Sequence, residues 1–112
     1  MVTVSHSYNA DDRHIRLSIQ GHAGYAERGK DIICSAVSIL LHTVVEYIEA
    51  MDRMWYFAKP PNISLVPGDA VIEVICRDDE TFVEALRVIL FALTGCKVLS
   101  EGYPQYVRLT ES

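Results

Sequence analysis

Alternating apolar and polar residues predict two strands at the start of the chain. In residues 2–9, Val2 and Val4 alternate with polar neighbours, and in residues 14–20 every second residue is aliphatic. A period of two is typical of strands with one buried face. The Asn-Ala-Asp-Asp sequence between them forms turns through side-chain to backbone hydrogen bonds, so an antiparallel hairpin is expected.

From residue 32 onward the apolar residues are spaced by three and four, which predicts a helix of about five turns. Asp31 stands where the N-cap belongs, and Lys59-Pro60-Pro61 prevents the helix from continuing. The helix is therefore expected to end near residues 52–57. Its apolar stripe consists of Ile33, Val37, Leu40, Leu41, Val44, Ile48 and Met51.

A second hairpin and a second helix follow. Residues 63–66 and 70–76 flank a Pro-Gly-Asp turn and predict two more strands. Acidic residues at 78–80 favour the start of a helix, and Gly95 is expected to end it in a left-handed conformation. A short last strand is expected around residues 106–109. The apolar stripe of the second helix consists of Phe82, Leu86, Ile89, Leu90 and Leu93.

The predicted order of elements is ββαββαβ, which favours an α+β fold with a mainly antiparallel sheet packed with two helices. The chain has 112 residues, half of them apolar, and this suits one domain over residues 1–112 with a single core.

Charge and composition narrow the range of partners. The chain has 10 basic and 15 acidic side chains and a formal net charge of -5, which disfavours nucleic acid and attracts basic partners. We find neither a signal-sequence pattern nor the roughly 20 consecutive apolar residues of a membrane span, so a cytoplasmic protein without a membrane partner is expected. Three cysteines without a C-x-x-C pair favour neither disulfides nor a zinc site, and no metal or other cofactor is expected.

Cys34 is the candidate nucleophile. If Asp31 is the N-cap, Cys34 is the third helical residue, where unpaired N–H groups and the helix dipole favour a thiolate. The competing interpretation is that Cys34 is a small buried hydrophobic residue. Cys76 and Cys96 have no such surroundings and are expected to be structural.

His22 is the candidate partner, because an imidazole can stabilise a thiolate and later protonate a leaving amine. The spacing fits a polar loop residue equally well. His6 and His14 are expected on the solvent faces of their strands, and His42 lies two turns beyond Cys34 in the same helix.

The run GHAGYA at residues 21–26, followed by GKDIICSAVS at residues 29–38, closely resembles the signature of the ribosomal-processing cysteine protease family, Prp. The chain length and the order of elements also fit that family. The resemblance implies a cytoplasmic, homodimeric cysteine endopeptidase. Its implied substrate is the precursor of a large-subunit ribosomal protein, whose N-terminal extension is removed by cleavage after a Phe-Phe-Ala-like sequence.

The same resemblance implies a role for individual residues. Cys34 would be the nucleophile and His22 the proton donor, and Gly21, Asp31 and Ser38 would support the site or bind the substrate backbone. The expected chemistry is attack by the Cys34 sulfur on the scissile carbonyl, followed by hydrolysis of the thioester. The backbone N–H of Cys34 is the expected oxyanion donor.

Two alternatives remain open. The chain could be a prophage-type homologue that processes capsid or scaffold proteins. It could also be a non-catalytic, dimeric α+β binding module in which Cys34 is a buried helix residue.

Overall fold

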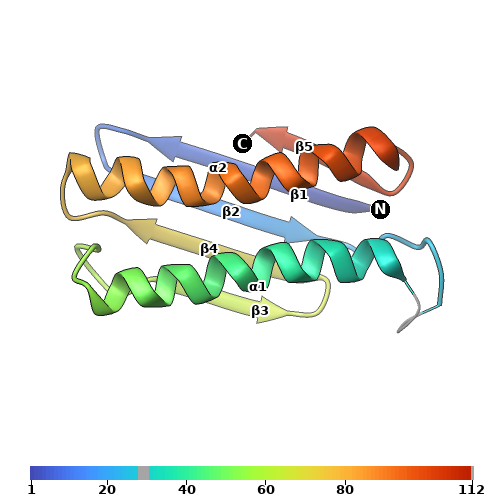
Figure 1. Cartoon of the computed structure of the whole chain (residues 1–112), viewed down its shortest axis with the longest axis horizontal. Coiled ribbons are helices and arrows are strands. Elements are labelled where there is room, and N and C mark those ends of the chain that lie inside the picture. Colours follow the sequence, from blue (N-terminus) through green and yellow to red (C-terminus); the bar gives the residue numbers. More distant parts are fainter. Residues whose placement is uncertain (28–30, 112) are drawn as a thin grey trace.

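The structure is a computed structural model that describes residues 1–27 and 31–111. Its elements confirm the predicted ββαββαβ order and the α+β fold class (Figure 1). They are β1 (Val2–Asn9), β2 (His14–Gln20), α1 (Ile32–Arg53), β3 (Asn62–Val66), β4 (Asp69–Ile75), α2 (Asp79–Gly102) and β5 (Val107–Glu111).

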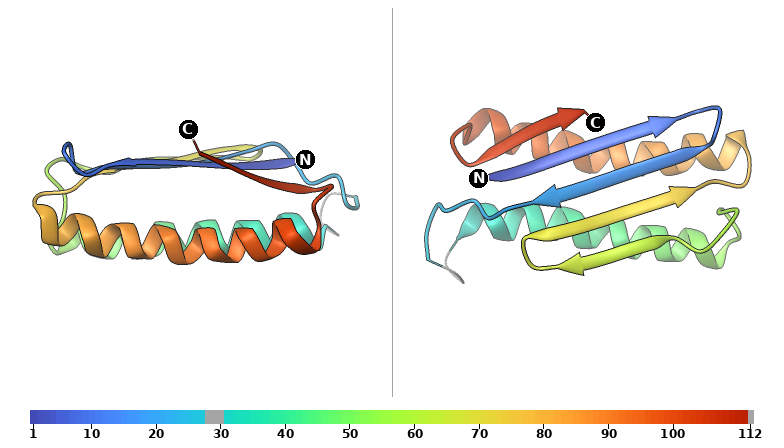
Figure 2. Two further views of the ribbon diagram at one scale, coloured as in Figure 1. Left: turned by 90° about the horizontal axis from the view of Figure 1, so that it is seen from above. Right: turned by 180° about the vertical axis from the view of Figure 1, so that it is seen from behind.

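The strands form one sheet in the order β3-β4-β2-β1-β5. Both predicted hairpins are present, since β1 pairs with β2 and β3 with β4 in antiparallel fashion. Strands β2 and β4 are also antiparallel, whereas β1 and β5 are parallel. The two helices lie side by side on one face of the sheet and leave the other face open (Figure 2).

The hydrophobic core lies between the sheet and the helices. Alternate strand residues such as Val4, Ile15 and Ile72 are buried, as the period of two predicts. Helix α1 covers them with side chains at three- and four-residue spacings, including Ile33 and Ile48. Sheet and helices therefore each contribute one apolar face, which is how a chain of this size forms a two-layer core.

Helix α2 does not end at Gly95, contrary to the expectation from sequence, but continues to Gly102. A Cβ atom at Gly95 would lie 2.9 Å from Cδ1 and 3.0 Å from Cδ2 of Leu40, which belongs to α1. The glycine therefore permits close packing of the two helices rather than a left-handed cap. The sequence pattern of a cap and that of a close helix contact are the same at this position.

Helix α1 is, within residues 1–27 and 31–111, the one helix that is long and apolar enough to cross a membrane by length and composition. This departs from the expectation that no apolar stretch reaches such a length. In this fold the helix lies along the sheet (Figure 2). It buries Ile33, Val37, Val44, Val45, Ile48 and Met51. A core helix of a soluble protein passes the same test, so the composition alone is weak evidence for a membrane span.

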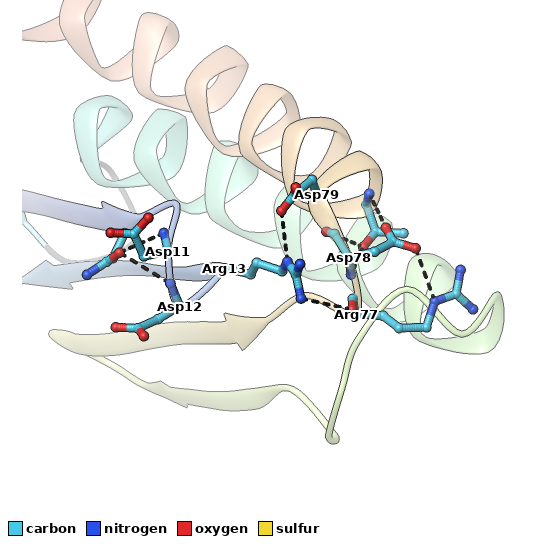
Figure 3. Close-up of polar contacts among 8 residues, drawn as sticks. Asp11, Asp12, Arg13, Arg77, Asp78 and Asp79 are labelled. Carbon is cyan, nitrogen blue, oxygen red and sulfur yellow. Dashed lines mark hydrogen bonds and ion pairs between the residues drawn. The ribbon is translucent and has the colours of Figure 1, made fainter.

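The β1–β2 turn is tied to the start of α2, at the end of the sheet far from the first turn of α1 (Figure 1). Asn9 Oδ1 accepts the N–H of Asp11 at 2.9 Å, as the turn sequence predicts. Arg13 Nε donates to Asp79 Oδ1 at 2.9 Å (Figure 3). An exposed pair of this kind contributes about 0–1 kcal/mol, so it orients the turn more than it stabilises the fold.

The contact at Gly95 gives a first prediction. Gly95→Leu should lower the free energy of unfolding by about 1–3 kcal/mol, because the new side chain must displace Leu40 between the helices. Urea denaturation would measure the change. Gly102→Leu is the matched control, since a Cβ at Gly102 meets nothing within 4 Å. Equal stability of the two variants would contradict this packing role.

Candidate active site

The candidate residues gather at the end of the sheet where β2 ends, α1 begins and the β3–β4 turn lies (Figure 1). His22 follows the end of β2 at Gln20, and Asp31 directly precedes the first residue of α1. Arg28, Gly29 and Lys30, the last two of which belong to the motif, lie outside the described residues.

Asp31 holds the start of α1 and the preceding loop together. Its Oδ1 accepts the N–H groups of Ile33 and Cys34, both at 3.0 Å, which confirms the predicted N-cap. Its Oδ2 accepts the N–H groups of Tyr25 at 3.0 Å and Ala26 at 3.4 Å. One buried carboxylate thus binds both segments of the motif.

These hydrogen bonds keep Asp31 ionised. The N–H of Cys34 contributes most, with those of Tyr25, Ala26 and Ile33, and together they lower the pKa of the carboxyl although its burial acts to raise it. The negative charge therefore remains next to the helix start at neutral pH.

Cys34 is the third residue of α1, as predicted, and its side chain is half-buried. The backbone N–H of Ala23 donates to Cys34 Sγ at 3.3 Å. This N–H and the N-terminal end of α1 both place partial positive charge near the sulfur, and the carboxylate of Asp31 caps the same helix end. A thiol in these surroundings is suited to act as a nucleophile.

The backbone N–H of Cys34, the expected oxyanion donor, serves the helix cap in this structure, and its role toward an oxyanion stays a prediction. It donates to Asp31 Oδ1, so the helix cap already occupies it. The N–H of Ala23 is the donor that points to the sulfur instead. Sequence reasoning missed Ala23 because a backbone group leaves no mark on the residue type.

His22 lies beside this contact but is not joined to the thiol. Within residues 1–27 and 31–111, no hydrogen bond links the imidazole to Cys34 Sγ. The exposed ring lies against Gly68 of the β3–β4 turn, where a Cβ atom would be 2.7 Å from His22 Nε2. Gly68 also accepts the N–H of Gly21 at 2.9 Å. The proposed dyad thus stays a prediction.

Gly21 is required by the backbone. Its φ is +90°, and a Cβ atom there would lie 2.3 Å from the carbonyl oxygen of Met1. Ser38 is exposed, one turn beyond Cys34, and its side chain makes no hydrogen bond within the described part of the chain. The structure therefore explains Gly21 and leaves the supporting role of Ser38 as a prediction.

The other two cysteines are structural, as expected. Cys76 and Cys96 are 2% and 3% exposed. Burial raises the pKa of each thiol to about 11, and nearby Asp78 adds to the effect at Cys76. Among the three free cysteines, Cys34 alone is partly accessible.

The remaining histidines lie elsewhere in the fold. His14 is on the open face of the sheet, with Nε2 2.6 Å from Glu73 Oε2. The expectation that His6 faces solvent is wrong, because it continues the inward face of β1 and its side chain is 17% exposed. Its Nε2 atom lies 3.9 Å from Glu111 Oε1. His42 is exposed on α1.

A tyrosine cluster fixes the loop to the far end of the chain. The Tyr25 ring meets Tyr103 at 5.9 Å and Tyr106 at 5.3 Å between centroids, both in edge-to-face geometry. Sequence reasoning missed this contact, since no local pattern links residues so far apart. The cluster holds Tyr25 where its N–H reaches Asp31.

Comparison with known proteins identifies the family. The model of the cysteine protease Prp family matches residues 1–108. The ribosomal processing cysteine protease Prp of Mycoplasma pneumoniae is 27% identical over 99 residues, covering 88% of each chain.

Solved structures share the fold. The crystal structure of the essential ribosomal processing protease Prp from S. aureus, with a covalently linked product peptide, has a TM-score of 0.80 at 24% identity and full coverage of both chains. SMU.848 from Streptococcus mutans has a TM-score of 0.68 at 20% identity, covering 99% of this chain and 93% of the other. With the family match over nearly the whole length, the chain belongs to the cysteine protease Prp family and is a cysteine protease.

Proposed function

We propose that this protease removes the N-terminal extension of a large-subunit ribosomal protein in the cytoplasm. The observation that carries the proposal is the position of Cys34 at the start of α1. The backbone nitrogen of Ala23 lies 3.3 Å from the Cys34 sulfur, and His22 directly precedes Ala23 in the chain. The Mycoplasma pneumoniae relative is named for ribosomal processing. A net charge of -5 suits a basic ribosomal substrate.

In the proposed mechanism Cys34 Sγ attacks the scissile carbonyl carbon and the N–H of Ala23 donates to the oxyanion. His22 takes the proton of the thiol, and the C–N bond breaks as His22 gives that proton to the leaving amine. Water then adds to the thioester, releases the new carboxyl terminus and restores the thiol. This requires the His22 ring to turn from Gly68 toward the sulfur, and catalytic contacts often tighten only when substrate is bound.

We also propose a homodimer formed through the outer surface of the helix layer. Both helices carry exposed apolar side chains that could form this surface: Ile39 (65% exposed), Tyr47 (56%), Phe91 (82%) and Val98 (65%). A cluster of such residues on a soluble protein is typical of an interaction surface. A second copy would cover the same residues on both partners, as two-fold symmetry requires.

The dyad gives the prediction that tests the function. Iodoacetamide should alkylate Cys34 in the folded protein but not Cys76 or Cys96, which are buried and have pKa values raised to about 11. His22→Ala should move the pH profile of Cys34 alkylation upward and lower peptide cleavage by about 10²-fold or more. Cys34→Ala should abolish cleavage.

His42→Ala is the matched control, because it removes an exposed histidine of α1 away from the loop. Mass spectrometry from pH 5 to 9 would give the alkylation rate at each cysteine. Cleavage of a peptide that contains Phe-Phe-Ala would be followed in parallel. An unchanged profile and rate in His22→Ala would exclude the dyad.

A further prediction separates the two roles of Asp31. In Asp31→Asn the amide oxygen can still cap Ile33 and Cys34, but its NH₂ group would face the N–H of Tyr25. Hydrogen exchange should therefore accelerate at residues 25 and 26 and not in the first turn of α1. Cleavage should fall, because the loop carries the N–H of Ala23.

The pH dependence of stability supplies an independent measurement. The pKa of Asp31 is lower in the native state than in the unfolded state, where it is about 3.9. The contribution of the ionised carboxylate to the free energy of unfolding is therefore present above the unfolded pKa and is lost as pH falls through the native pKa. The stability difference between wild type and Asp31→Asn should thus shrink below about pH 4. Asp78→Asn, at the cap of α2, should leave the loop and cleavage unchanged. Faster hydrogen exchange in the first turn of α1 in Asp31→Asn would contradict the division of Asp31 into a cap oxygen and a loop oxygen.

Another prediction concerns the dimer. Phe91→Glu should shift the protein from dimer to monomer in sedimentation velocity, because two charges would be buried against apolar side chains. Ser7→Glu, on the open face of the sheet, is the control and should remain dimeric. A wild type that is monomeric at micromolar concentration would refute the proposal.

A further inference from the structure

The two edges of the sheet differ in charge. Strands β3 and β5 are its edge strands. Strand β5 carries the exposed charges of Arg108 and Glu111, which hinder pairing with another chain. Strand β3 carries no charge, and its Leu65 and Val66 are 41% and 56% exposed. An uncharged edge with exposed apolar side chains invites an added strand.

The free edge of β3 leads directly to the candidate site. Strand β3 ends at Val66, and the following turn brings Gly68 against the imidazole of His22. The carbonyl of Gly68 also accepts the N–H of Gly21, which fixes the turn to the motif loop. A substrate segment that pairs along β3 would therefore extend toward His22 and the motif loop.

The two apolar residues of this edge lie on opposite faces of the sheet. Leu65 pairs with Ala70, which is buried toward the helices, so Leu65 lies on the side of α1 and Cys34. Val66 pairs with Asp69 and lies on the open face. Successive side chains of an added strand would meet one residue on each face.

We propose that the free edge of β3 binds the substrate as an additional strand, with Leu65 and Val66 contacting its side chains. The occupant is an extended segment of the substrate adjoining the scissile bond, because the edge is continuous with the His22 and Gly68 contact. Backbone hydrogen bonds would supply affinity and the alternate side chains specificity. The inference rests on the proposed function, since the occupant is the protease substrate.

The decisive experiment uses Cys34→Ala, which keeps a bound peptide intact, and a synthetic 12-residue peptide centred on Phe-Phe-Ala. Hydrogen exchange would be followed at residues 62–66 of β3 and at residues 107–111 of β5. Saturating peptide should slow exchange in β3 by about 10-fold or more and leave β5 unchanged. Exchange in β3 that does not respond to peptide overturns the inference. Slow exchange in β3 without peptide, which becomes fast when the protein is diluted, also overturns the inference. In that case a second copy of this chain occupies the edge.

Kinetics of the active enzyme separate this inference from the proposed function. Val66→Lys should raise KM for the peptide about 10-fold or more, and the rate of Cys34 alkylation should not change. Thr110→Lys adds the same charge to the other edge and should leave KM unchanged. A Val66→Lys enzyme with wild-type KM overturns the inference while cleavage by Cys34 stands. An inert Cys34 and an uncleaved peptide refute the proposed function, whereas exchange in β3 still decides whether peptide binds that edge.

Discussion

The carboxylate of Asp31 is the interaction on which the site depends. Two N–H groups from α1 and two from the preceding loop converge on its two oxygens. It joins the helix start that carries the thiol of Cys34 to the loop that carries the N–H of Ala23. Because the donors lower the pKa of Asp31, the group stays charged across the neutral range.

This arrangement has a chemical consequence. The cap uses the N–H of Cys34, which the sequence suggested as the oxyanion donor. The loop brings a second backbone donor, the N–H of Ala23, to the sulfur. The cluster of Tyr25 with Tyr103 and Tyr106 then supports the loop from the end of the chain.

Features with a local cause could be predicted from the sequence. The hairpins, the starts of both helices and the position of Cys34 follow from periodicity, turn residues and caps within a few residues. Gly95 and His6 could not be assigned correctly, because a helix contact and the inward face of a strand end depend on partners elsewhere in the chain. The contact of Gly68 with His22 depends on β4 pairing with β2, which the order of elements does not reveal.

The two ββα halves of the chain show how one local structure serves two purposes. Both helices begin after an aspartate N-cap, and Cys34 in α1 occupies the same third position as Thr81 in α2. At α2, Thr81 Oγ1 accepts the N–H of Asp78 at 3.1 Å and completes a capping box that stabilises the helix.

At α1, the sulfur in this position instead accepts an N–H from the loop, at Ala23. The first turn of α2 also carries Asp79 and Glu80, whereas that of α1 carries no acidic residue. The positive end of α1 therefore faces the cap carboxylate and the thiol without an acidic side chain in the first turn. Cysteine thus takes the place of the capping hydroxyl at α1, and its sulfur contacts the loop instead of completing a capping box.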